Sequence, residues 1–195
     1  MGLFEKIFRR KTNHKIEDEN LPSFWEDDYC QIEIVPRKNI ENIEKSIKQI
    51  DEFTKKTRTE YGFTDIFMRE GLPFPTINEE LRTDYFEKLL TEKGFEKATK
   101  IRYDGYTIID CSKTTSNAFV LPCFNFFYDC NDEFINNIWI STSLITSNDH
   151  FSKILEALYE IGESCELVLI DWNSSVLIDL TDRNQIKKYL MSYWK

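Results

Sequence analysis

The chain has 195 residues, 41% of them hydrophobic and 14% aromatic, with only 6 glycines and 5 prolines and a formal net charge of −9. This composition excludes collagen-like and mainly disordered chains, and the length suits one globular domain. The negative charge argues against a general nucleic-acid binder, because such proteins need a basic surface to displace counterions from phosphates. No apolar run approaches the length of about 18 residues that a membrane-spanning helix requires.

The first 20 residues differ in character from the rest of the chain. Four apolar side chains recur there at helical spacing, Leu3, Phe4, Ile7 and Phe8, and basic side chains lie beside them. We expect a short helix packed on its own domain, then a solvated linker, so the chain divides into a tail (1–20) and a single α+β domain (21–195). A membrane-surface contact by residues 2–11 is an alternative that we favour less.

The compartment follows from the leader pattern and the cysteines. Charged residues interrupt the apolar stretch that a secretory signal needs, so we expect a cytoplasmic protein. The five cysteines are odd in number and widely scattered: Cys30, Cys111, Cys123, Cys130 and Cys165. A chain of this size needs no disulfide framework, so we expect reduced thiols that pack as small hydrophobic groups.

The first predicted elements of the domain are a strand and a helix. Along residues 28–36 (DYCQIEIVP) apolar and polar residues alternate until Pro36 ends the pattern, which is typical of a half-buried strand. Isoleucines then recur at positions 40, 43, 47 and 50. This spacing of three and four predicts a helix of about 18 residues, with Asn39 as its N-cap.

A second strand and helix are expected next. Residues 62–70 (GFTDIFMRE) predict a strand, which the glycine and proline residues at positions 71, 73 and 75 end. Asn78 is expected to cap a helix that carries its apolar residues at helical spacing and ends at Gly94.

After Gly94 the pattern changes to strands. Two apolar runs flank Asp104-Gly105, the strongest short hairpin signal in the chain. Two longer runs follow, NAFVLPCFNFFYD and FINNIWISTSL, and Pro122 in the first predicts an edge strand or a bulge.

The last part of the chain predicts a helix, a hairpin and a final helix. The first helix opens at residues 147–149 and closes near Gly162. CELVLIDW and VLIDL follow as two strands around a turn at Asn173–Ser174, and Thr181 or Asp182 caps the last helix. The whole order predicts an α+β fold: a largely antiparallel sheet of about six to eight strands with about four covering helices, in a single domain.

The search for catalytic motifs gives mostly absences. The chain holds no glycine-rich phosphate loop, no H-E-x-x-H, no C-x-x-C and no G-x-S-x-G motif. Its two histidines, His14 and His150, fall in the linker and at a helix start. A pair of His150 with Cys123 or Cys130 stays open, although no spacing predicts it. We expect no metal site, no cofactor and no catalytic residues.

Carboxylates are the only abundant reactive groups, and three of them end predicted strands: Asp110, Asp171 and Asp179. Two carboxylates brought together can hold a divalent metal or carry out acid–base chemistry. A metal-assisted hydrolase is therefore one alternative function that the sequence leaves open. A peripheral membrane-associated scaffold that uses residues 2–11 is another.

Aromatic residues beside acidic loops favour protein binding instead. Aromatic anchors inside a polar rim are typical of interface hot spots, and acidic surface speeds association with a basic protein. We expect partner contacts from the first loop and from the late hairpin: Trp25, Glu26, Asp27, Asp28, Asp171, Trp172 and Asn173. The sequence does not indicate an oligomeric state.

Several segments resemble small acidic immunity proteins of bacterial polymorphic-toxin and contact-dependent inhibition systems. They are WEDDYCQIEIVPRKNI, GFTDI, the GY before a strand, and LIDWNSSVLIDLTDRNQIKKYL near the end. The similar segments are short motifs spread over residues 24–195, and the basic tail is not among them. It implies a non-enzymatic α+β protein that binds a cognate, basic toxin domain and neutralises it by occlusion.

Overall fold

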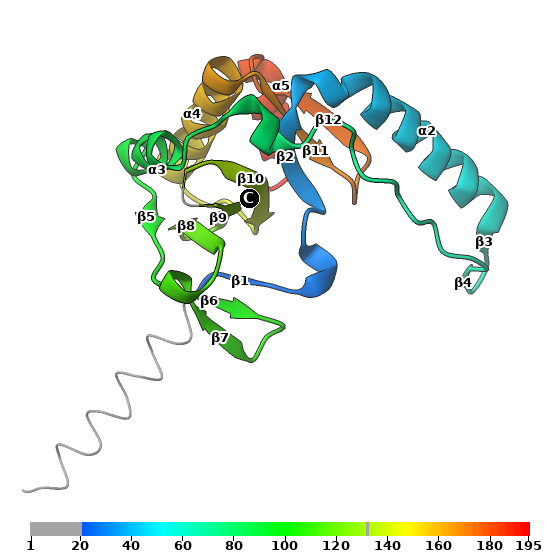
Figure 1. Ribbon diagram of the computed structural model, residues 1–195. Helices are drawn as coiled ribbons and strands as arrows, with labels where there is room; N and C mark the ends of the chain where they lie inside the picture. The colour runs from blue at the N-terminus through cyan, green and yellow to red at the C-terminus, as the bar shows by residue number, and fades with distance from the viewer. Residues whose placement is uncertain (1–20, 132) are drawn as a thin grey trace, which may run out of the picture.

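The computed structural model describes residues 21–131 and 133–195, so the predicted tail (1–20) lies outside the described residues. Its centre is a seven-stranded sheet in the order β12-β11-β2-β10-β9-β8-β5, with every neighbouring pair antiparallel (Figure 1). The strands of this sheet are β2 (Ile32–Pro36), β5 (Glu96–Lys97), β8 (Ser116–Leu121), β9 (Phe124–Cys130), β10 (Ile135–Thr142), β11 (Leu167–Asp171) and β12 (Val176–Asp179).

Two smaller sheets and four α-helices complete the described fold. The smaller sheets are β1-β6-β7, from β1 (Ser23–Phe24), β6 (Lys100–Tyr103) and β7 (Thr107–Asp110), and β3-β4, from β3 (Arg58–Thr59) and β4 (Gly62–Phe63). The helices are α2 (Ile40–Thr57), α3 (Thr83–Glu92), α4 (Asn148–Cys165) and α5 (Arg183–Met191). Short 3-10 turns are η1 (Glu26–Asp28), η2 (Arg37–Asn39), η3 (Thr76–Glu79) and η4 (Cys111–Lys113). The predicted α+β class with a largely antiparallel sheet is confirmed.

The main core lies on one face of the seven-stranded sheet, under α3, α4 and α5. Because side chains alternate along a strand, β9 sends Phe126 into this core and Phe127 to the other face. Fully buried Phe86, Leu158 and Ile186 bring the three helices onto it. Burying these large side chains is what holds the helices to the sheet, at about 1.5–3 kcal/mol each.

The second face carries two separate clusters. Phe24 and Ile101 cover Phe127 and Trp139 where the β1-β6-β7 sheet packs. Further along the same face, Ile43 of α2 packs with a set of side chains from the large sheet and its end: Val35, Val168, Ile170 and Trp172. Glu33 lies between the two clusters, because its ladder partners Trp139 and Ile170 belong to one cluster each.

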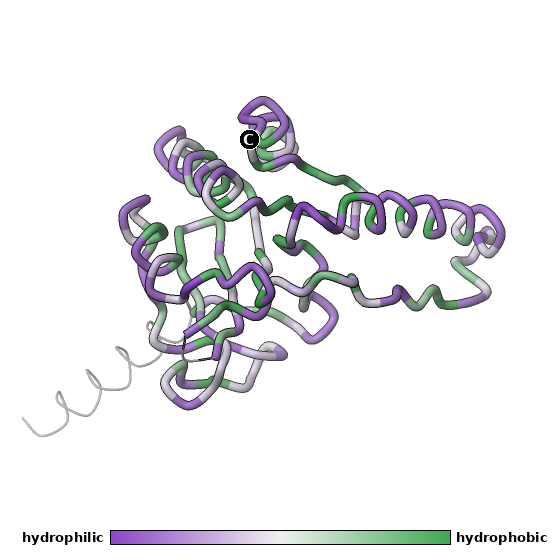
Figure 2. The backbone as a smooth tube through the Cα atoms, turned by 45° about the horizontal axis from the view of Figure 1, so that its top comes forward, coloured by the Kyte–Doolittle hydropathy of each residue, from purple (hydrophilic) through white to green (hydrophobic). Residues whose placement is uncertain are grey.

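A long arm extends from the body at the second cluster. It consists of α2, the β3–β4 hairpin and residues 64–71, which we call the return segment because they lead back to the body (Figure 1). Ile43 is the only fully buried residue of α2, and Ile40, Ile47 and Ile50 pack on the same cluster while partly buried. The last two turns of the helix therefore lie beyond the core. Hydrophobic stretches alternate with polar ones along the return segment in Figure 2.

Several predicted helix and strand boundaries agree with the structure. The Asp104-Gly105 hairpin joins β6 to β7, and both residues have positive φ angles, 49° and 73°. Ser147 caps α4, although that helix continues past Gly162 to Cys165. Asp182, rather than Thr181, caps α5 by accepting from Asn184 N at 2.8 Å.

Other predictions were wrong. Only Gly62–Phe63 of the run 62–70 is a strand, because no other strand of residues 21–131 and 133–195 lies beside the rest of it. Asn78 caps no helix: it lies in η3, Glu80 then takes a positive φ, and α3 starts only at Thr83.

Two more residues take roles that differ from the predicted ones. Pro122 lies in the tight turn between β8 and β9, so one predicted strand is in fact a hairpin. Asn39 stands at the N-cap of α2, but its side chain binds the backbone of Phe74, at 2.8 and 3.2 Å, instead of the helix.

Candidate functional site

The strand that follows the first predicted partner-binding segment and the strand that precedes the second lie side by side in the large sheet. The first loop leads into β2, and the late turn follows β11, its antiparallel neighbour. Ile32 and Asp171 are paired in the ladder, and Trp172 N donates to the carbonyl of Gln31 at 2.9 Å. The fold therefore brings together residues separated by most of the chain.

The first loop, Trp25–Asp28, is held in one shape by local contacts; we call it the acidic loop. Glu26 N donates to Asp104 Oδ1 at 2.9 Å, and Trp25 N donates to Asp28 Oδ2 at 3.3 Å. The Trp25 ring lies on Gly105, where an added Cβ would stand 2.6 Å from the ring edge. Only glycine permits this close approach, so the hairpin turn fixes the position of the indole.

The acidic loop presents unpaired negative charge beside an aromatic surface. Glu26, Asp27 and Asp28 are exposed, and none of the three forms an ion pair with another described residue. Trp25 is 54% exposed and Tyr106, next to Gly105, is 81% exposed. Charged groups around partly exposed rings match the rim and anchor of a protein interface.

The late turn differs from the predicted picture. Asp171 and Trp172 are only 3% and 7% exposed, because each has partners inside the protein. Asp171 accepts from Tyr189 Oη at 3.2 Å and from Asn173 N at 3.0 Å. Both side chains therefore support the turn from within, and of the three residues named for this turn only Asn173 is exposed.

Trp172 belongs to a buried polar cluster that sequence reasoning missed. Its Nε1 donates to Glu33 Oε1 at 2.6 Å, and Arg69 of the return segment donates to the same oxygen at 3.2 Å. The Arg69 guanidinium also lies over the Trp172 ring, 3.9 Å from its centroid. The alternation along residues 28–36 predicts Glu33 on the polar face of its strand. The only signal against this was the amphipathic helix that follows, whose apolar side could cover that face.

Burial raises the pKa of Glu33 to about 7, and the Arg69 charge offsets only part of this effect. The Glu33 side chain is 13% exposed and borders a cavity of about 220 Å³ that Val35, Leu72 and Asn137 also line. A carboxyl with this pKa changes its protonation state near neutral pH.

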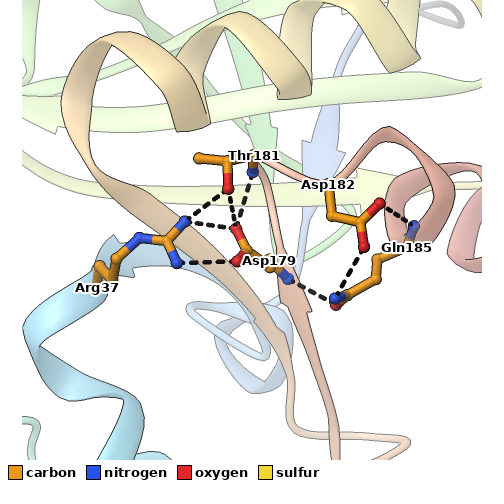
Figure 3. A network of polar contacts seen from close by, with 5 residues as sticks. All are labelled: Arg37, Asp179, Thr181, Asp182 and Gln185. Atoms are coloured by element: carbon orange, nitrogen blue, oxygen red, sulfur yellow. Dashed lines mark hydrogen bonds and ion pairs between the residues drawn. The ribbon is translucent and has the colours of Figure 1, made fainter.

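The three strand-end aspartates each have a separate structural role. Figure 3 shows Asp179 joined to Arg37 and Thr181, with Arg37 Nη1 donating to Asp179 Oδ2 at 2.9 Å. This guanidinium holds the pKa of Asp179 below its usual range. Asp110 accepts from Ser112 N, and Asp171 and Asp179 lie at opposite ends of the β11–β12 hairpin. The fold does not bring the three carboxylates together.

The described residues form no group of three or more His, Cys, Asp or Glu side chains placed to hold a metal ion. All five cysteines are free thiols. Cys123 Sγ lies 3.9 Å from His150 Nδ1, so the structure does bring this pair together. Burial raises the pKa of the Cys123 thiol, which keeps it in the protonated, weakly nucleophilic form.

Comparison with protein-family models, curated proteins and solved structures finds no match for this chain. Among the described helices, none is both long and apolar enough to cross a bilayer.

Proposed function

We propose that the protein is a non-enzymatic binding protein that neutralises a basic partner domain by occlusion, as an immunity protein neutralises its toxin. The observation that supports this most is the acidic loop: three consecutive exposed carboxylates, unpaired among the described residues and fixed beside a half-exposed tryptophan. A fixed loop binds with less loss of conformational entropy than a mobile one.

Charge is expected to act mainly on the rate of association. Complementary charges steer two proteins together, and the effect weakens as salt screens them. Trp25, which lies on Gly105, then supplies the apolar contact that slows dissociation, and the exposed Asn173 of the β11–β12 turn is a further candidate contact. The resemblance to immunity proteins seen in the sequence implies the same mode of action.

The test begins by isolating the partner with the tagged chain and purifying both proteins. Asp27→Lys/Asp28→Lys is expected to lower the association rate at least tenfold at low salt, with a smaller effect at high salt. Glu41→Lys/Glu44→Lys is the matched control, since it makes the same charge change at exposed positions of α2. Equal association rates for the two variants would contradict the proposal, as would a complex that leaves the partner active.

The strand-end aspartates supported a metal-assisted hydrolase as an alternative. No observation in the described residues favours it, because each of the three carboxylates is engaged in a different part of the fold.

A further inference from the structure

The arm carries four of the five most exposed large apolar side chains in the described part of the chain. Near its tip Tyr61 is 93% exposed and Phe63 61%, and in the return segment Ile66 is 83% and Met68 86% exposed. Side chains of this size gathered on one projecting element are typical of an interaction surface. The arm lies apart from the acidic loop, so its partner is a separate question.

The return segment offers an unoccupied edge for strand pairing. No backbone-to-backbone hydrogen bond joins residues 65–71 to any other described residue. Exposure alternates along it: Ile66 and Met68 are exposed, whereas Phe67 packs on Phe53 of α2 with ring centroids 5.4 Å apart. An extended segment with free backbone groups and alternating side chains accepts a second strand.

Charge indicates which partner this surface fits. Residues 40–70 contain six basic and seven acidic residues, a net charge of −1, whereas the whole chain carries −9. A basic protein is attracted to the acidic surface elsewhere and gains nothing from a nearly neutral arm. Two copies of this acidic chain, in contrast, meet with the least repulsion through their arms.

We propose that the arm is a homodimer interface, in which the return segments of two copies pair antiparallel about a two-fold axis at Phe67. This register sets Ile66 opposite Met68 of the second copy, an apolar pair. It also sets Asp65 opposite Arg69 of the second copy, an ion pair that forms twice by symmetry. Arg69 has five N–H donors, so it keeps its contact with Glu33 while it gains this carboxylate.

The shape and area of the arm agree with a dimer of modest affinity. A groove of about 330 Å³ runs between α2 and the return segment, lined by Phe53, Phe67 and Met68 among others. Met68 is unbranched and flexible, so its side chain can adjust to the surface of a second copy at this groove. At ~150 Å² for each fully exposed large side chain, the four exposed residues supply about 500 Å² per copy, near the lower limit for a specific interface.

Sedimentation velocity of the full chain tests the proposal. Between about 5 μM and about 500 μM the sedimentation coefficient is expected to rise from the monomer to the dimer value. Ile66→Lys/Met68→Lys is expected to stay monomeric throughout. Tyr106→Lys/Ile108→Lys, a matched pair of exposed apolar residues on the β6–β7 hairpin, is expected to dimerise like the unaltered chain.

Two results would overturn the arm interface. One is an unaltered chain that stays monomeric at every concentration, which would leave the arm to a different protein. The other is a dimer that Ile66→Lys/Met68→Lys does not weaken, which would place the interface elsewhere. Far-UV circular dichroism checks that the variants fold, and we expect no change because both replaced side chains are exposed. Neither result bears on the acidic loop.

Discussion

Replacing Glu33 by glutamine is expected to change how the stability of the protein depends on pH. The pKa of Glu33 is raised from 4.5 to about 7 in the native protein, so the folded state binds this proton more tightly than the unfolded state. The stabilising contribution is complete below pH 4.5 and is lost as pH rises through 7. The loss amounts to about 3 kcal/mol, because a tenfold change in proton affinity is worth about 1.4 kcal/mol.

Glutamine isolates this effect because it is uncharged and its oxygen still accepts from Trp172. The free energy of unfolding, from urea denaturation at several values between pH 4.5 and pH 8, is expected to fall with pH in the unaltered chain by about 3 kcal/mol more than in Glu33→Gln. Other titrating groups are present in both proteins and cancel in the difference. Glu41→Gln, at an exposed position, is the control and should parallel the unaltered chain. Parallel curves for Glu33→Gln would refute the reasoning.

Two further substitutions test the packing and capping of the helices. Gly162→Ala places a Cβ 2.6 Å from the carbonyl oxygen of Leu180, so we expect a net loss of about 1–3 kcal/mol despite the better helix propensity of alanine; a more stable variant in thermal and urea unfolding would contradict this. Asp182→Ala removes the side chain that caps α5 and is expected to cost about 1 kcal/mol, whereas Asp182→Asn should keep most of that stability; equal losses in the two variants would argue against the cap.

Local signals in the sequence located most of the elements, and they failed where a distant segment decided the outcome. The Asp104-Gly105 turn and the Asp182 cap depend on neighbouring residues alone, and both formed as expected. The run 62–70 has the composition of a strand, but the neighbour that would complete a ladder does not lie beside it in the fold. Asn39 is a residue type that often caps helices, but its side chain donates a hydrogen bond to the backbone carbonyl of Phe74 instead.

The candidate site shows the same division. Exposure of the acidic loop follows from three consecutive charged residues, which almost never enter a core together. Burial of Trp172 does not follow from any local pattern, because it depends on Glu33 and Arg69 reaching the same place from distant parts of the chain. Periodicity assigns Glu33 to a face of its strand but does not show which segment will later cover that face.

The position of β2 has a consequence for how the molecule is made. This strand lies between β10 and β11. Its Glu33 pairs with Trp139 and Ile170, so both sides of its ladder can form only after these later residues have been synthesised. At about 5–20 residues per second, the ribosome needs roughly 7–27 s to add the intervening residues, and pairing over such separations is itself slow. The nascent chain therefore exposes the apolar side chains of its central strand until β11 has been made. A messenger truncated before β11 would yield a product with an open edge in the middle of its sheet, which makes it a substrate for chaperones and proteases.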